Sequence, residues 1–301
     1  MMSDWTLWMR RALVAVPIVG CAGAAAQSPA TGSFSLTPVY QTDSALDSGG
    51  NVGYTAVYTT LGESWTLDAR STLRLGLNLD YEDWHFSDIP AFGGLQPWGD
   101  LYRFGISLPY SYTSEGGWRW TLSPTVEYSA ESGAELSDAL EYGASLSAAR
   151  RWSDNLTLGL GVGVYERIEQ TRVFPFLIVD WRMTDRLRVT NPLSAGPAGP
   201  AGLELSYALD SGWELGIAAA YRSFRFRLDD RGTVPGGIGE NDYIPLVARI
   251  GRRFSEALRL DFYAGASLDG RLRVEDANGI ERYDQNRDPA AILGLSLIGR
   301  F

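Results

Sequence analysis

The chain alternates apolar and polar residues over long stretches, and this period of two constrains its fold more than any other feature. From Leu73 to Tyr81 the odd positions are apolar, and the even positions are Arg, Gly, Asn and Asp. From Leu258 to Val274 the even positions are mostly apolar, and their neighbours include arginines and aspartates. Side chains of a β-strand point alternately to its two faces. The pattern therefore predicts long strands with one apolar face and one strongly polar face.

The connections between these strands alternate in length. Short polar segments recur at 68–71, 114–117, 153–155, 184–186, 210–212 and 255–257. Longer segments lie between them, at 42–50, 88–97, 131–137, 192–201, 230–241 and 276–288; only the connection near Gln170 is short where a long one is expected. Short turns at one end and long loops at the other are typical of a transmembrane β-barrel. We expect an all-β antiparallel meander barrel of about 14 strands, or 12 if the short segment 187–191 is not a strand.

Aromatic residues near the short turns indicate which face meets lipid. The segments Arg150–Val164 and Arg252–Ala266 share an arginine pair, an aromatic residue, a polar cluster and then strict alternation. Residues that fit an interfacial girdle at the short turns are Trp65, Trp118, Trp120, Trp152, Trp181, Trp213 and Phe254. A second girdle toward the long loops is expected at Trp84, Trp98 and Tyr102. A secreted soluble β-protein, with its apolar face inward, remains an alternative.

The N-terminus has the features of an export signal. Arg10 and Arg11 precede a short apolar run, and small residues follow up to Ala26. We therefore divide the chain into a signal peptide, 1–26, and a barrel, 27–301. Cys21 lies in a segment similar to a lipoprotein signal, so its lipidation stays open. It is the single cysteine, which excludes a disulfide framework.

Two segments resemble known proteins. The end of the chain, Ala291–Phe301, alternates apolar residues up to a terminal aromatic, and resembles the last strand of bacterial outer-membrane proteins. That resemblance implies recognition of Phe301 by the barrel-assembly machinery, although Gly299 stands where a bulky apolar residue is commoner. The segment Asn191–Tyr207 resembles an uncharacterised family of predicted outer-membrane barrels, which implies a fold and a location without an activity. Its Gly-Pro stretch predicts a rigid loop, either inside the lumen or over the mouth.

The polar faces of the strands predict the residues that line the barrel interior. A β-bulge near Arg222 is expected, since the apolar parity changes there to Phe224, Phe226 and Leu228, turning the neighbouring arginines inward. The candidate pore-lining residues are Arg225, Arg227, Arg249, Arg253, Arg259, Asp261, Asp269, Arg271 and Arg273. They form either an anion-attracting wall or a salt-bridged interior that braces the strands.

Enzyme chemistry is poorly supported by the residues present. The single histidine, His85, shares a strand face with Ser87 at about 7 Å, beyond hydrogen-bond reach. No catalytic residue, metal site or cofactor motif is predicted. A net charge of −10 and acidic long loops argue against nucleic acid as a partner. We expect an exported bacterial outer-membrane barrel, surrounded by lipid and lipopolysaccharide, that passes a small solute. The alternatives are a closed barrel with a structural or surface-interaction role, and an enzyme.

Overall fold

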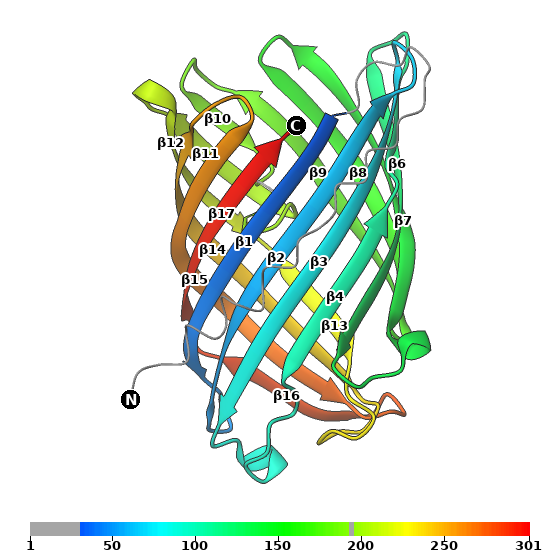
Figure 1. Ribbon diagram of the computed structural model, residues 1–301, viewed down its shortest axis with the longest axis vertical. Coiled ribbons are helices and arrows are strands. Elements are labelled where there is room, and N and C mark those ends of the chain that lie inside the picture. Colours follow the sequence, from blue (N-terminus) through cyan, green and yellow to red (C-terminus); the bar gives the residue numbers. More distant parts are fainter. Residues whose placement is uncertain (1–30, 193–195) are drawn as a thin grey trace.

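A computed structural model describes residues 31–192 and 196–301. Their strands form one closed sheet in which consecutive strands pair, until β17 closes the ring against β1 (Figure 1). The strands are β1 (Thr31–Ala45), β2 (Asn51–Thr66), β3 (Ser71–Ser87), β4 (Asp100–Ser107), β5 (Tyr110–Thr113), β6 (Trp118–Glu131), β7 (Leu140–Ser153), β8 (Leu156–Arg167), β9 (Gln170–Arg182), β10 (Leu187–Thr190), β11 (Gly202–Ala208), β12 (Trp213–Ala220), β13 (Arg222–Arg227), β14 (Ile238–Arg253), β15 (Leu258–Glu275), β16 (Glu281–Arg287) and β17 (Ala290–Arg300). Three 3-10 helices, η1 (Pro90–Phe92), η2 (Leu136–Ala139) and η3 (Asp210–Gly212), lie in connections.

The 17 strands make 14 passages of the barrel wall, because three passages are each divided in two (17 − 3 = 14). The breaks fall between β4 and β5, between β12 and β13, and between β16 and β17. The register with the neighbouring strand continues unchanged across each break. Two breaks contain a proline, Pro109 and Pro289, which has no N–H to give to the ladder. The expected antiparallel barrel of 14 strands is confirmed, and 187–190 is a strand.

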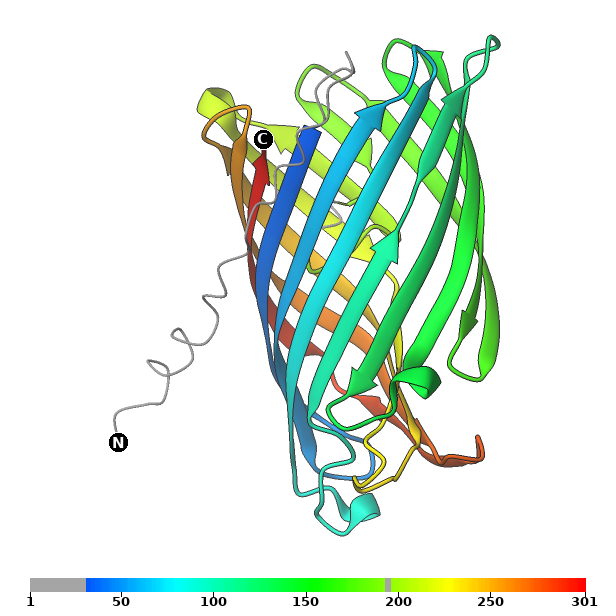
Figure 2. The ribbon, with the colours of Figure 1, turned by 45° about the vertical axis from the view of Figure 1, so that its right-hand side comes forward.

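The two ends of the barrel differ as expected. The short turns lie together with the start of β1 and the C-terminus, and the long loops lie at the opposite end (Figure 2). The loop end departs from the expected bounds where strands extend into the expected loops, and the segment 42–50 begins inside β1, which ends at Ala45. The segment 230–241 already contains the start of β14, and 276–288 contains a tight turn followed by β16. Among the described residues, no helix is long and apolar enough to cross a membrane.

The outer surface near the short turns has the expected aromatic residues. Trp152 and Phe254 are 58% and 55% exposed. The guanidinium of Arg150 lies 5.5 Å from the Trp152 ring, and that of Arg252 lies 5.2 Å from the Phe254 ring. The two similar sequence segments therefore build the same cation–π contact beside two different turns.

The first and last strands meet closely at the turn end. The backbone N–H of Gly32 donates to the carbonyl of Phe301 at 2.8 Å, and the N–H of Phe301 donates back at 3.0 Å. A Cβ at Gly299 would lie 2.0 Å from the Phe34 ring. The aromatic ring that covers Gly299 thus comes from β1, which explains why a bulky side chain is missing at this position of the last strand.

The wall is incomplete toward the loop end, between β9 and β13. β10 pairs with β9 only over Arg182–Asp180, so among the described residues no strand pairs with this side of β9 from Gln170 to Val179. β11 likewise ends its pairing at Ala220 of β12. Beyond this level β13 extends across the mouth, where Arg227 forms a parallel bridge with Ala130 of β6 on the far side of the ring. The β13–β14 hairpin therefore covers the mouth of the barrel.

Candidate functional site: a lumen closed at the loop end

Inward-facing charges near the short turns form a first group, which we call the turn-side cluster: Glu204, Glu214, Arg249, Arg259 and Asp261. Arg249 is at its centre, with its side chain 1% exposed. It donates from Nη1 to Asp261 Oδ1 at 2.8 Å, from Nη2 to Glu214 at 2.5 Å, and also to Glu204. Arg259 Nε donates to Asp261 Oδ2 at 2.7 Å. Three carboxylates thus surround two guanidinium groups.

A second group of charges joins the β13–β14 hairpin to the strands beside it. Arg225 Nη2 donates to Glu275 at 2.6 Å, and its Nε donates to the carbonyl of Ile168 at 2.8 Å. Arg172 of β9 donates to Glu240 of β14 at 2.7 Å. These side chains bridge the region where β9 has no paired strand, so ion pairs replace a backbone ladder there. Arg227 adds a bond of 2.8 Å to Glu169 in the turn between β8 and β9.

An aromatic ring lies between two guanidinium groups in the lumen. Phe224 has the Arg103 guanidinium 3.7 Å from its ring centre and that of Arg222 at 4.5 Å. Arg103 also donates to Glu82 at 2.7 Å, and the Tyr58 hydroxyl donates to the same carboxylate at 3.1 Å. The cavity beside them measures about 10 Å³, which is room for about one water molecule. A larger solute does not fit in this cavity.

Apolar side chains fill the lumen at the loop end, and we call them the plug. Its members are Val39, Leu46, Val52, Tyr54, Ala56, Trp84, Phe86, Ile89, Trp98, Leu101, Phe226, Leu228, Val234, Tyr243, Leu272, Val274, Tyr283 and Ile292. Trp98, in the connection after η1, lies 4.9 Å from Phe86, 5.2 Å from Phe226 and 5.5 Å from Trp84, measured between ring centres. Its ring is 2% exposed. The plug therefore joins wall residues to residues carried by the long loops.

The Gly-Pro loop lies inside the barrel. Ala198 is buried against Ala218, Ala220, Val247 and Tyr263, all inward-facing. Pro197 lies beside Gly294, where an added Cβ would be 3.5 Å from its Cγ. At the start of the loop, the Asn191 amide donates to the carbonyls of Leu177 and Gly202 and accepts from the N–H of Val179. Of the two placements predicted for this loop, the one in the lumen is found for residues 196–199; residues 193–195 lie outside the described residues.

Several sequence-predicted orientations were wrong at the loop end. The register of β12 and β13 against β14 does not change near Arg222, so the expected bulge is absent there. Phe226 and Leu228 belong to the plug instead of facing outward. The register shift lies one strand pair later, between Asp242 and Ile244 against β15.

A residue with positive φ causes the change of parity in β15. Asp269 has a φ of 48°, and beyond it Leu272 and Val274 are buried in the plug. Arg271 lies on the opposite face, half-exposed and paired with Asp284. Leu272 was therefore expected on the wrong face, and Arg271 and Asp269 lie on the side away from the plug.

The remaining candidate pore residues are mostly neutralised. Arg273 pairs with Asp242 at 2.6 Å, and Arg253 is exposed at the turn end. The buried Arg225, Arg227 and Arg249 pair with carboxylates, which matches the alternative of a salt-bridged interior; a role in lining a conducting path stays a prediction. Trp84 and Trp98 were wrongly assigned to an outer girdle, whereas Tyr102 is 43% exposed.

Two kinds of enzyme site are relevant in the part of the chain that the structure describes: a catalytic histidine and a metal-binding group. His85 is exposed, and its Nε2 lies 2.6 Å from Asp43 Oδ1. No described group of three or more His, Cys, Asp or Glu side chains is arranged to hold a metal ion. Sequence reasoning missed Arg103, Arg222 and Phe224 as a group, because they come from strands far apart in the chain.

Comparisons with known proteins find one matching family model and several similar solved structures. The family model "Domain of unknown function (DUF6268)" matches residues 119–233, which confirms the resemblance to an uncharacterised family over this part of the chain. A solved structure of the COG4313 outer membrane channel from Pseudomonas putida F1 is similar, with 12% identity, a TM-score of 0.45, and coverage of 93% of this chain and 97% of that one. The P. putida toluene transporter TodX is 10% identical, with a TM-score of 0.45 and coverage of 92% of this chain and 91% of that one. The β domain of the Bordetella autotransporter BrkA is 12% identical, with a TM-score of 0.37 and coverage of 91% of this chain and 100% of that one. No curated protein matches.

Proposed function

We propose that this chain is an outer-membrane β-barrel of Gram-negative bacteria through which small solutes pass when its plug opens. The meander of 14 passages, with apolar residues outside and polar residues inside, suits a bilayer. In this proposal the short turns face the periplasm, the long loops face outward, and Phe301 serves barrel assembly. The signal peptide predicted for 1–26 would bring the chain to that membrane.

Uneven filling of the lumen supports passage. Inward-facing residues on β1, β15 and β17, such as Thr37, Asp261 and Ser296, are fully buried. Inward-facing Ser123 and Thr125 of β6 and Ser145 of β7 are only partly buried. Accessible polar wall along β6 and β7 therefore leads from the turn end toward the plug. A closed barrel would have no need of such a face.

The observation that carries the proposal is that loop residues complete the plug. Ile89, Trp98, Leu228 and Val234 lie outside the strands, in the connections of the loop end. Loops are the parts of a fold that move most easily. Displacement of Trp98 would open the aromatic part of the plug without breaking the barrel.

Single-channel conductance in a planar bilayer tests this gate. We expect the wild-type mature chain to conduct rarely, and Trp98→Ala to conduct for a much larger fraction of the time. Trp152→Ala removes an exposed indole at the other end, and serves as the matched control with wild-type behaviour. Folding of each variant is verified by its heat-dependent mobility in electrophoresis. A folded Trp98→Ala barrel that never conducts would reject passage, and would favour a closed barrel acting through its long loops.

Ion selectivity is a separate expectation. An arginine wall predicts anion preference, whereas the turn-side cluster holds three carboxylates and two arginines. We therefore expect the open barrel to show weak selectivity, measured as the reversal potential across a salt gradient. Strong anion preference would return the pore-lining arginines to the leading role.

A further inference from the structure

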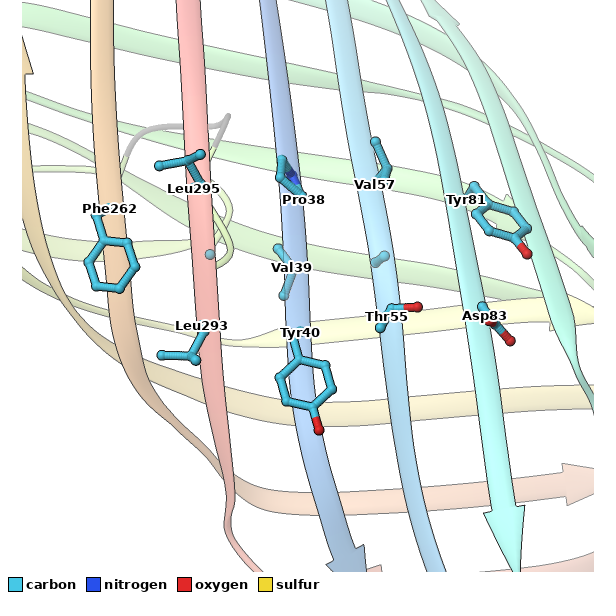
Figure 3. A pocket seen from close by; sticks show the side chains of 12 residues that line it. Pro38, Val39, Tyr40, Thr55, Val57, Tyr81, Asp83, Phe262, Leu293 and Leu295 are labelled. Carbon is cyan, nitrogen blue, oxygen red and sulfur yellow. The ribbon is translucent and has the colours of Figure 1, made fainter. Parts of the chain in front are cut away.

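A groove of about 550 Å³ lies on the outer wall of the barrel, where the first and last strands meet. Its volume is in the range of small-molecule sites, about 300–1,000 Å³. It extends over β15, β17, β1, β2 and β3 (Figure 3). The lining side chains that point outward include Phe262, Leu293, Leu295, Thr55, Val57 and Asp83.

The local sequence explains the hollow. The register between β1 and β17 runs from Ser33 to Leu36 and again from Val39 to Gln41, with Pro38, which lacks an N–H, in the interval. The floor contains Val39, Ala56 and Gly294, which occupy the inward-facing positions of their strands, so backbone alone separates the groove from the lumen there. Gly294 has no side chain at all, and Pro197 of the lumen loop supports it from inside. Small residues and a proline thus leave the wall thin along this line.

The outward side chains of β3 set the level of the groove in a bilayer. Leu75, Leu77 and Leu79 are apolar, whereas Tyr81 and Asp83 follow toward the loop end. The Tyr81 ring lies 5.1 Å from that of Tyr102 on β4, as expected for rings at the membrane interface. The groove therefore begins at hydrocarbon level, beside Leu293 and Leu295, and ends at head-group level, beside Asp83.

The polar end of the groove is acidic. Among residues 31–192 and 196–301, no ion pair is found for Asp83. The nearby Asp100 accepts a hydrogen bond from the Tyr81 hydroxyl at 2.8 Å, and His85 is engaged with Asp43 at 2.6 Å. A carboxylate at the edge of a membrane is stabilised by a cation. The head group that complements this end therefore carries positive charge and donates hydrogen bonds.

We propose that this groove binds a membrane amphiphile with one alkyl chain and an ammonium head group. The chain lies against Phe262, Leu293 and Leu295, and the ammonium group pairs with Asp83, beside the Thr55 hydroxyl. This site rests on the membrane location that the proposed function includes, but it does not depend on passage through the lumen, so loss of conductance and loss of labelling are separate outcomes.

Photolabelling tests the site with two probes of equal chain length, each with a diazirine near the middle of the chain. One probe is a long-chain alkyl amine, and the other is the corresponding carboxylate. The barrel in uncharged detergent micelles containing a chelator is labelled, and the labelled peptides are identified by mass spectrometry. We expect the amine to label β1, β2 and β17 roughly tenfold more than the carboxylate does, as for one charge-assisted contact. If the amine labels β7, β8 and β9 as strongly as it labels β1, β2 and β17, the proposed site is rejected.

Two variants separate the chain pocket from the head-group contact. Val57→Trp fills the groove, and is expected to reduce amine labelling of β17 at least fivefold. Val162→Trp places the same ring on the outer face of β8, where Val162 is 41% exposed, and is expected to change nothing. Asp83→Asn keeps the groove, so it is expected to reduce the amine to the level of the carboxylate. If Asp83→Asn leaves the preference intact, the ammonium pairing is rejected, and this result does not depend on the folding of Val57→Trp.

Discussion

Arg249 holds the turn-side cluster together, and its replacement by methionine is the sharpest test of how the lumen wall is stabilised. The substitution keeps most of the side-chain volume but removes bonds to Glu204, Glu214 and Asp261. Arg259 would then remain paired with Glu214 and Asp261, and Glu204 would lose its ion pair. Removal of one partner from a buried ion pair costs about 3–5 kcal/mol. Glu214 is 28% exposed and can be hydrated, so we expect a loss near the lower end, about 3 kcal/mol.

Equilibrium unfolding in guanidinium chloride, with the barrel in lipid vesicles and tryptophan fluorescence as the signal, measures this loss. Arg253→Met provides the matched control because Arg253 is exposed on the same strand, and should change the unfolding free energy by less than about 0.5 kcal/mol. Glu204→Met in the Arg249→Met background removes one unpaired charge, and should restore part of the stability. A loss below about 1 kcal/mol for Arg249→Met, or no rescue by Glu204→Met, would refute the view that burial of unpaired carboxylates dominates.

Three further changes test the backbone and the strand closure. Asp269→Gly should be tolerated because φ is 48°, whereas Asp269→Val should lower the unfolding free energy by about 1–3 kcal/mol in the same assay. The N–H groups of Ile280 and Asn278 lower the pKa of Asp276, so the turn is stabilised above the ordinary pKa of aspartate and loses this as pH falls through the lowered value. The protection factor of the Ile280 amide, which is its exchange rate relative to the unstructured rate at the same pH, should therefore fall in acid, and Asp276→Ala should remove this change in protection. Gly299→Leu should reduce the folded fraction in electrophoresis by displacing the Phe34 ring, and added Phe34→Ala should restore it.

Alternation made the middle of the barrel predictable from the sequence. Leu75 and Leu77 belong to a strand on which no second layer of protein packs. The alternation of residues along the strand is therefore enough to assign each side chain to the lumen or to lipid. The same reasoning failed at the loop end. There Leu272 and Phe226 pack on other parts of the protein instead of lipid, and their partners are remote in the chain.

The candidate site was harder to predict than the wall. Tryptophan is a residue type that is typical of membrane interfaces. Only the three-dimensional path of the connection after η1 places Trp98 against Phe86 and Phe226. The sequence predicted the inward-facing Arg249 and Arg259 and gave a salt-bridged interior as one of two alternatives. It did not identify the partners Glu204 and Glu214, and it wrongly grouped the exposed Arg271 with the interior. Glu204 pairs with Arg249, and Glu240 pairs with Arg172, across different strands. The spacing of residues along one strand carries no information about such pairs.

The missing ladder along β9 changes how the barrel can deform. A closed ring of hydrogen-bonded strands has a fixed circumference, and behaves like a hoop. This ring is continuous at the turn end, but at the loop end no backbone ladder joins β9 to β13. Side-chain hydrogen bonds hold the two edges together there, from Arg172 to Glu240 and from Arg225 to the Ile168 carbonyl. Widening at one rim would then require only side-chain bonds to part, while the other rim keeps its diameter.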